Sequence, residues 1–293
     1  MKNCRKNQLF IIFFELLLVM IFFVACASHP QIEADLEAYL YPAESFLPEK
    51  IEWQEVEPGI ARLDFENPEF PLIYHLVRIE LNEPGLELVC YPDEKTRFSG
   101  ATFKGQKTSD FSQKNSCTVA VNASPFNGSR FGKKRSLAGV HIVKGAMLSH
   151  PCEKYAALLF NWDNVEERSA QIIHNQDSQL LENCTYAFGA FFSVLKDGEL
   201  VDFKVRSHNS RTGAGLSKDG KILYLLVVEG EKPDKSEGMS YPQCGQVFKA
   251  LGCENALEFD GGSSSQLFIN GKNALNYSTI VVQGNSFGFR IKK

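Results

Sequence analysis

The sequence has no excess of basic side chains: its 293 residues include 31 Lys and Arg against 35 Asp and Glu. Proteins that bind nucleic acids normally present a basic field, so the net charge of −4 argues against that class of partner. The chain also has no low-complexity tract, and 44% of its residues are hydrophobic. Collagen-like and wholly disordered proteins are therefore excluded, and the length suffices for one large domain without disulfide bonds.

The spacings that mark common metal sites are also missing. No two cysteines have C-x-x-C spacing, so zinc sites and thioredoxin-like sites have no support. His141, His174 and His208 lack metal-ligand spacing, and the first two have the positions of ordinary strand histidines. We therefore expect neither a metal nor a cofactor.

The N-terminus has the layout of a secretory signal peptide. Lys2, Arg5 and Lys6 precede an apolar run over residues 9–25, which ends in a small residue. The run is short for a permanent span of a hydrocarbon core of about 30 Å. We therefore predict a signal peptide over residues 1–25.

The end of this run resembles a bacterial lipobox, the motif in which a cysteine becomes lipidated and starts the mature chain. Residues 23–26 read Phe-Val-Ala-Cys, with Phe23 where most lipoboxes have leucine. The resemblance implies lipidation of Cys26 and a membrane-anchored lipoprotein of the bacterial cell envelope, in the periplasm or at the cell surface. A plain cleaved signal and an uncleaved anchor are the alternatives.

An acidic, proline-containing segment follows the cysteine. Residues 27–58 hold eight acidic side chains against one lysine, whereas residues 59–293 are nearly neutral. We interpret residues 26–50 as a solvated tether and residues 51–293 as one functional domain. A domain without a strongly acidic surface is compatible with an anionic substrate.

The domain contains six cysteines, namely Cys90, Cys117, Cys152, Cys184, Cys244 and Cys253. An even number in an exported protein permits disulfides, and buried free thiols are the alternative. Cys244 and Cys253 bracket a predicted helix, which would hold them about 13 Å apart, too far for a disulfide.

From residue 70 onward the sequence reads as many short strands separated by turn signals. Residues 82–85, Asn-Glu-Pro-Gly, lie between apolar runs at 73–81 and 86–91, which is typical of a hairpin. Ile222–Val228 is an unbroken apolar run, as in a central strand buried on both faces.

One helix is clearly marked in the sequence. Ser240 is a suitable N-cap, Cys244 and Val247 fall on one face, and Gly252 supplies a C-terminal stop. A strand at residues 256–259 follows, which predicts a β-α-β crossover whose two strands run parallel and near each other. We predict a single α+β domain with a mixed, mostly antiparallel β-sheet core and few helices.

Three polar segments follow predicted strands and combine glycine with reactive or binding groups, namely residues 122–128, 208–215 and 258–265. In the third, Asp260 stands at a strand end before Gly261 and Gly262, whose backbone can form a nest for an anionic oxygen. This segment is neither a Walker loop nor a G-x-S-x-G elbow, so none of its serines is assigned as a nucleophile by motif. A tight turn capped by Asp260 is the alternative.

Two charged side chains stand out beside these segments. Arg211 has the planar fork that suits a phosphate, although an arginine beside a strand also forms surface ion pairs. Glu229 follows seven apolar residues, and a carboxylate there is costly unless it lies at a rim or is paired. With Asp260 it makes a candidate pair of carboxylates at strand ends.

The order of these segments resembles the phosphodiester glycosidase family, which includes N-acetylglucosamine-1-phosphodiester α-N-acetylglucosaminidase. Members have an Arg-Thr-x-x-Gly element, a Val-Asp-Gly strand end and an Asn-Leu-Asp-Gly-Gly-Gly-Ser-Ser segment. Residues 211–215, 228–230 and 258–264 match these elements, with glutamate for aspartate in the second and serine for the third glycine in the last. Residues 122–126 match an Asn-Gly-Gly-Phe-Phe-like element loosely. The resemblance covers about residues 55–293.

The resemblance implies hydrolysis of a sugar-1-phosphodiester similar to an N-acetylglucosamine phosphodiester, which releases the sugar from a phosphate-linked glycan or glycolipid. It implies Asp260 and Glu229 as paired catalytic carboxylates and Arg211 as a catalytic residue that grips the phosphate. It also implies substrate contacts from six further residues, namely Asn122 and Thr212 to sugar hydroxyls and Gly261, Gly262, Ser263 and Ser264 to the phosphate. The alternative is a non-catalytic glycan-binding surface lipoprotein on the same fold, which the substituted loop at residues 122–126 favours.

Overall fold

β-Strands form most of the structure, a computed structural model that describes residues 46–67, 69–129, 132–177 and 179–292. These residues lie in one unit that begins at Ala43. The predicted signal peptide, the lipidation site at Cys26 and the tether up to residue 45 lie outside the described residues. Within the described ranges, no helix has the length and apolarity needed to cross a membrane.

The largest sheet carries the strand ends that the sequence singles out. It contains, in spatial order, β1 (Gln54–Glu57), β2 (Ile60–Asn67), β3 (Leu72–Glu80), β17 (Ile222–Val228), β16 (Arg211–Ser217), β18 (Cys253–Glu258), β14 (Phe192–Lys196) and β15 (Glu199–Leu200). All of its neighbouring strands pair antiparallel.

Three smaller sheets complete the β structure of the described residues. One contains β10 (Ala146–Ser149), β9 (His141–Val143), β13 (Tyr186–Ala190), β11 (Ala156–Asn161) and β12 (Ser169–Ile173). The second contains β20 (Lys272–Asn273), β19 (Leu267–Ile269), β6 (Val119–Asn122), β21 (Ser286–Ile291) and β4 (Leu86–Tyr91). The third contains β5 (Phe103–Lys104), β8 (Lys134–Leu137) and β7 (Phe126–Asn127).

Helices are few in the described part of the chain. They are α4 (Thr108–Lys114), α5 (Tyr241–Ala250) and the short 3-10 helices η1 (Val165–Glu167), η2 (Gln179–Asn183) and η3 (Gly262–Ser264). The prediction of a mostly antiparallel β core with few helices is therefore confirmed.

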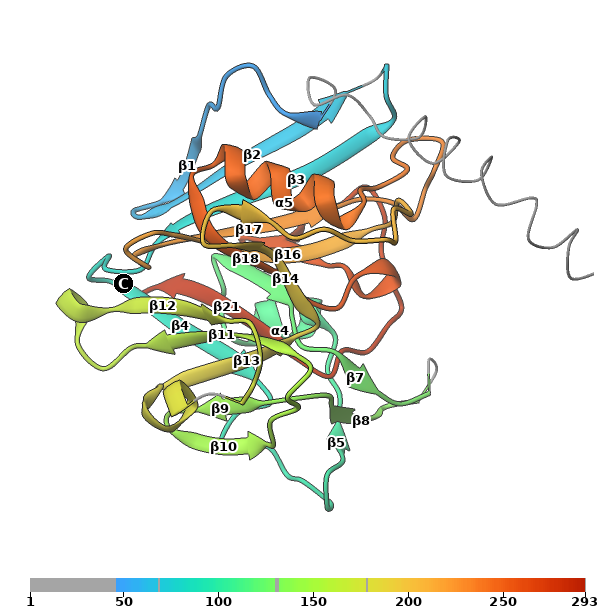
Figure 1. The fold of residues 1–293 in the computed structure, drawn as a ribbon. Coiled ribbons are helices and arrows are strands. Elements are labelled where there is room, and N and C mark those ends of the chain that lie inside the picture. Colours follow the sequence, from blue (N-terminus) through green and yellow to red (C-terminus); the bar gives the residue numbers. More distant parts are fainter. Residues whose placement is uncertain (1–45, 68, 130–131, 178, 293) are drawn as a thin grey trace, which may run out of the picture. The chain divides into compact units, whose positions relative to one another are not determined.

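One core joins the eight-stranded sheet to the two five-stranded sheets. Val227, Leu257, Phe160 and Phe287 come from these three sheets, and each is at most 1% exposed within a single cluster. Helix α5 covers the opposite face of the large sheet, against β14 and β18 (Figure 1). Strand β17 is buried at every position after Ile222, so both of its faces are apolar, as the sequence predicts.

The predicted β-α-β crossover is present, but a further strand, β16, lies between its two parallel strands. Helix α5 begins after Ser240, whose N–H and hydroxyl both donate to Gln243 Oε1, and the chain turns at Gly252 into β18. Strands β17 and β18 each pair antiparallel with β16, so they run parallel to each other on either side of it.

The predicted hairpin at residues 82–85 is wrong. Strand β3 pairs with β2 and β17 in the large sheet, whereas β4 pairs with β21 in a five-stranded sheet. The turn therefore carries the chain from one sheet to another. A local turn signal fixes a reversal of the chain and not the partner of the strand that follows.

All six cysteines of the domain are free thiols in the structure. Cys90, Cys117, Cys244 and Cys253 are buried, and burial raises the pKa of the Cys117 thiol to about 12. Buried thiols of this kind behave as small hydrophobic side chains. Of the two alternatives that the sequence leaves open, the free thiols are the one found.

Candidate active site

The ends of β17, β16 and β18 lie side by side, and they bring the two candidate carboxylates to one edge of the sheet (Figure 1). The register pairs Arg211 with Val228 and Gly213 with Glu258. Glu229 and Asp260 therefore leave the sheet at nearly the same level, with β16 between them. Two interstrand spacings put their Cα atoms about 10 Å apart.

Asp260 is a largely buried acid. Its N–H donates to Ala123 O at 2.9 Å, and its C=O accepts from Asn122 Nδ2 at 2.7 Å. Burial raises the pKa of its carboxyl to about 6, although a hydrogen bond from Ser264 acts in the opposite direction. A carboxyl with this pKa can take up or release a proton near neutral pH.

The turn after Asp260 depends on its two glycines. The N–H of Gly262 donates to Ser210 O at 2.8 Å, and Gly262 has a φ of 58°, a conformation that side-chain-bearing residues rarely adopt. A Cβ on Gly261 would lie 2.9 Å from Ser210 O. The backbone therefore folds tightly over Ser210 and starts η3, which carries Ser263 and Ser264.

Asn122 and Thr212 are held within the protein. The hydroxyl of Thr212 lies 3.1 Å from both Asn122 Oδ1 and Ser265 Oγ, and Asn122 Oδ1 also accepts from the N–H of Gln266. Both side chains are fully buried. In the structure they tie the Asp260 turn to β6 and β16, and their predicted contact with sugar hydroxyls stays a prediction.

Glu229 is paired, as its position at the end of an apolar strand requires. Its Oε1 accepts from His75 Nε2 at 2.9 Å and from the N and Nδ2 of Asn276 at 3.0 and 3.2 Å. Only 2% of the residue is exposed. These donors fix the carboxylate in one orientation and compensate its charge.

His75, on β3, links Glu229 to a third acid. Its Nδ1 lies 2.7 Å from Asp64 Oδ1, on the neighbouring strand β2. Burial alone would lower the pKa of His75, but the hydrogen bonds and charges of Asp64 and Glu229 outweigh it, and the pKa is raised. Ionised carboxylates can only accept hydrogen bonds. A protonated His75 carries a hydrogen on each ring nitrogen, so it can donate to Asp64 and to Glu229 at the same time.

Tyr277 connects the two halves of the site. It follows Asn276 in the chain, and its hydroxyl lies 3.4 Å from Ser210 Oγ. The carbonyl of Ser210 in turn accepts a hydrogen bond from the N–H of Gly262, in the turn after Asp260. A continuous series of polar groups thus runs from Glu229 to Asp260.

Arg211 points away from this series. Its Nε donates to Met239 O and its Nη2 to Ser207 O, each at 2.8 Å, and its guanidinium lies 3.9 Å from the centre of the Tyr241 ring. Among the described residues, no ion pair joins it to Asp260. The predicted role of Arg211 as a phosphate ligand therefore stays a prediction.

A further buried acid lies under α5. Glu258 is 1% exposed, and burial raises its pKa to about 7, against opposing effects from Arg211 and Cys244. It is the last residue of β18, two positions before Asp260, and a Cβ on Gly213 would lie 3.2 Å from both its Oε1 and the ring of Phe248 in α5. Within the described residues, no cluster of three or more His, Cys, Asp or Glu side chains is arranged to hold a metal ion.

Sequence reasoning missed His75, Asp64 and Asn276. The signal that could have found His75 is a histidine within a run of mostly apolar residues, which the structure shows as the buried strand β3. No comparable signal marks Asn276, which lies in a polar loop.

A comparison with protein families gives a match to phosphodiester glycosidase over residues 115–286. The match spans more than half of the chain and includes Asn122, Arg211, Glu229 and Asp260. A search of curated proteins gave no match.

Solved structures share the fold at low sequence identity. A hypothetical protein from Synechocystis aligns with 83% of this chain at a TM-score of 0.62 and 15% identity, and this chain spans 64% of its length. The catalytic domain of zebrafish N-acetylglucosamine-1-phosphodiester α-N-acetylglucosaminidase has a TM-score of 0.57 and 15% identity, covering 86% of this chain and 87% of that domain. A putative exported protein from Burkholderia pseudomallei has a TM-score of 0.55 and 13% identity, with 74% of each chain covered.

At these identities the structural similarity establishes the fold alone. The family match and the order of the strand-end segments supply the rest of the assignment. The chain belongs to the phosphodiester glycosidase family.

Proposed function

We propose that this protein hydrolyses a sugar-1-phosphodiester and releases the sugar from a phosphate-linked glycan or glycolipid. The observation that carries the proposal is a largely buried carboxyl, Asp260, whose pKa is raised to about 6, beside a glycine- and serine-rich turn. A second buried carboxylate, Glu229, stands across one strand from it. Carboxyl pairs of this kind are the catalytic groups of most glycoside hydrolases.

The reaction breaks the bond between the anomeric carbon and the phosphate oxygen. The electron pair of that bond leaves with the phosphomonoester, and the oxygen of a water molecule bonds to the anomeric carbon. Asp260 accepts the proton of this water and later releases it to solvent. Glu229 stabilises the positive charge that develops on the sugar. A phosphomonoester is a good leaving group, so the reaction needs little acid assistance.

The Asp260 turn is the proposed phosphate site. The N–H groups of Gly262 and Ser264 already donate to backbone carbonyls. The donors proposed for anionic oxygens are therefore the N–H groups of Gly261 and Ser263 and the hydroxyls of Ser263 and Ser264. Arg211 uses two of its five guanidinium N–H groups on Met239 O and Ser207 O, so the other three can join these donors. We therefore assign phosphate binding to the turn and Arg211 together.

The proposed sugar is similar to N-acetylglucosamine. The zebrafish relative with the same fold is named for that sugar linked through a 1-phosphodiester. The nearly neutral domain does not oppose an anionic diester of this type.

A panel of sugar-1-phosphodiesters tests the proposal, with release of free sugar and of phosphomonoester measured together. We expect turnover of at least one N-acetylhexosamine diester and a loss of at least 100-fold in kcat for Asp260→Asn. Glu258→Gln is the matched control, since it removes another buried carboxyl, two residues before Asp260, that lies close to Phe248 of α5. Glycan binding without any release of sugar would support the non-catalytic alternative instead.

We also propose that the protein is exported and anchored to the bacterial envelope through a lipid on Cys26. Support comes from the lipobox-like sequence at residues 23–26 and the acidic segment that follows it. Mass spectrometry of the mature N-terminus tests this directly. A chain that starts at an unmodified Ala27 would contradict it, and Cys26→Ala should move the protein from the membrane to the soluble fraction.

A further inference from the structure

Strand β4 lies at the edge of its sheet, and among the strands of the described residues it pairs with β21 alone. The N–H of Lys292 donates to Gly85 O at 2.8 Å, in register with that ladder. Hydrogen-bonded pairs in an antiparallel ladder recur at every second residue, so Glu87, Val89 and Tyr91 turn their backbone groups toward β21.

Leu88 and Cys90 therefore turn their N–H and C=O groups outward. Across the described ranges, no hydrogen bond reaches these four groups, although Leu88 is 6% and Cys90 9% exposed. The next outward carbonyl, that of Leu86, accepts from Arg168 Nη1 at 3.0 Å. The free edge of β4 is thus short. It starts at Leu88, the next outward-facing residue after Leu86, whose carbonyl Arg168 contacts.

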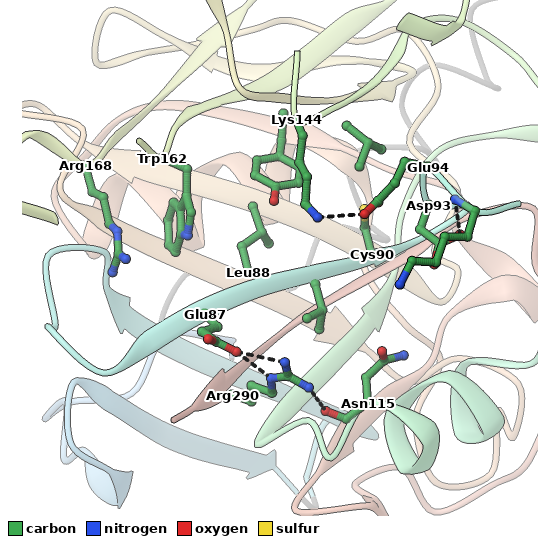
Figure 2. A pocket seen from close by; sticks show the side chains of 14 residues that line it. Glu87, Leu88, Cys90, Asp93, Glu94, Asn115, Lys144, Trp162, Arg168 and Arg290 are labelled. Atoms are coloured by element: carbon green, nitrogen blue, oxygen red, sulfur yellow. Dashed lines mark hydrogen bonds and ion pairs between the residues drawn. The ribbon is translucent and has the colours of Figure 1, made fainter. Parts of the chain in front are cut away.

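This free edge forms the floor of a cavity of about 500 Å³, a volume within the ordinary range of ligand sites. Figure 2 shows β4 running between two rows of side chains. Arg168, Trp162 and Lys144 stand on one side of the strand, and Glu87, Arg290 and Asn115 stand on the other. The cavity is therefore a groove along the outer edge of β4, with a wall on each side.

The charges in this groove leave an excess of cations. Lys144 pairs with Glu94 at 2.6 Å, and Arg290 pairs with Glu87 at 2.8 Å. Lys95 forms no ion pair with any described residue, and the remaining lining acid, Asp93, accepts from the N–H of Lys95 and the hydroxyl of Thr96. The side chains that line the groove therefore carry more positive than negative charge, so a carboxylate of a ligand would meet an unpaired cation there.

Arg168 is the second cation without an acidic partner. It is 9% exposed, its Nη1 donates to two backbone carbonyls, and its buried Nε has no partner among the described residues. Its guanidinium lies 4.6 Å from the centre of the Trp162 ring. A buried donor without an acceptor is costly, and a ligand acceptor would remove that cost.

We propose that this groove binds an extended peptide segment of another protein, which adds a strand to β4 and carries an acidic side chain toward Arg168 and Lys95. An added strand supplies acceptors and donors at the spacing of Leu88 and Cys90 and pairs all four outward groups. An oligosaccharide fits less well, because Arg168 already lies over the aromatic ring on which a sugar would stack.

Backbone hydrogen exchange in the full chain, followed residue by residue by NMR, tests the proposal. The probe is an acetylated and amidated pentapeptide of alternating valine and glutamate. We expect it to slow exchange of the Leu88 and Cys90 amides at least 10-fold and to leave Glu87 and Val89, which are already bonded to β21, unchanged. A version N-methylated on alternate backbone nitrogens should bind at least 10-fold more weakly.

Charge reversal tests the second half of the proposal. Lys95→Glu should weaken binding of the acidic peptide at least 5-fold, and Lys272→Glu, at the other edge of the same sheet, is the matched control. Binding that leaves the Leu88 and Cys90 amides unprotected would overturn the proposal. Protection of these amides by chitotriose but not by the peptide, or by raising the protein concentration alone, would also overturn it in favour of a sugar or a second copy.

Discussion

The imidazole of His75 joins two carboxylates, with Nδ1 2.7 Å from Asp64 Oδ1 and Nε2 2.9 Å from Glu229 Oε1. The hydrogen bond from His75 lowers the pKa of Asp64, and the two acids together raise the pKa of His75. The side chain of Asp64 is 38% exposed, whereas that of Glu229 is buried. His75 thus connects a solvated acid to the buried carboxylate of the candidate site, as a positioning residue.

We expect His75→Gln to lower kcat about 10- to 100-fold with a smaller change in KM. Glutamine can donate to Glu229 or to Asp64 but cannot bridge both, so Glu229 loses its fixed orientation. Steady-state kinetics over pH 5 to 9 provide the measurement. An unchanged kcat across that range would remove His75 from the positioning of Glu229.

The contacts of His75 with Asp64 and Glu229 should also make the free energy of unfolding depend on pH in a defined way. Because the folded-state pKa of His75 lies above the ordinary value of 6.5, its stabilisation is complete below about pH 6.5 and is lost as the pH rises through the folded-state pKa. Urea unfolding should show His75→Gln less stable than the parent by about 1–3 kcal/mol at pH 6 and by less at pH 9. A difference that grows with pH would contradict this assignment.

Asp260→Asn should abolish turnover and stabilise the fold at neutral pH. Burial raises the pKa of Asp260 from 3.8 to about 6, so ionisation of this carboxyl opposes folding. That penalty is absent below about pH 3.8 and grows as the pH rises to about 6. We expect the variant to gain about 1–3 kcal/mol over the parent at pH 7 and almost nothing at pH 4, as measured by urea unfolding. In the parent, kcat/KM should fall below about pH 6.

Glu258→Gln tests whether a buried carboxyl next to the candidate site affects stability without affecting catalysis. Its pKa is raised from 4.5 to about 7 by burial, so the variant should gain stability as the pH rises between these values. Because Glu258 lies under α5, kcat should change less than 3-fold. A loss of activity as large as that of Asp260→Asn would show that the α5 side of the sheet takes part in the reaction.

Gly262→Ala should impair activity more than stability. Both Gly262 and Gly198 have positive φ, at 58° and 78°, so alanine costs about 1 kcal/mol at either position. Gly198 lies in a turn with no other atoms near its Cβ position, which makes it the matched control. We expect equal losses of unfolding free energy and at least a 10-fold rise in KM for Gly262→Ala only. Equal kinetics for the two variants would remove the turn from substrate binding.

The part of the site that the sequence predicts is the part that local signals specify. Asp260 precedes two glycines, and Glu229 ends an unbroken apolar strand, so each is visible within a window of ten residues. Their partners are not local: His75 lies 154 positions from Glu229, and Asn276 lies 47 positions from it. Cross-strand register decides these contacts, and no single-sequence pattern gives that register.

The same limit explains the two main differences in geometry. Arg211 reads as a phosphate ligand or a surface ion pair, and in the structure its guanidinium donates to the backbone carbonyls of Ser207 and Met239 and lies against Tyr241 of α5. The turn at residues 82–85 reads as a hairpin, but the strand that follows it, β4, pairs with β21 instead of with β3. The signal and lipidation at Cys26 stay predictions, because they concern residues that the structure does not describe.

The pairing of β4 with β21 has a consequence for how the chain comes to be folded. Arg290 contacts Glu87 across 203 positions of sequence, and the ladder around it closes the sheet that contributes to the central core. The ladder joins residues 86–91 to residues 286–291, so it forms only after both segments have been synthesised. Contacts of such long sequence separation form slowly, so we expect this sheet to close late in folding.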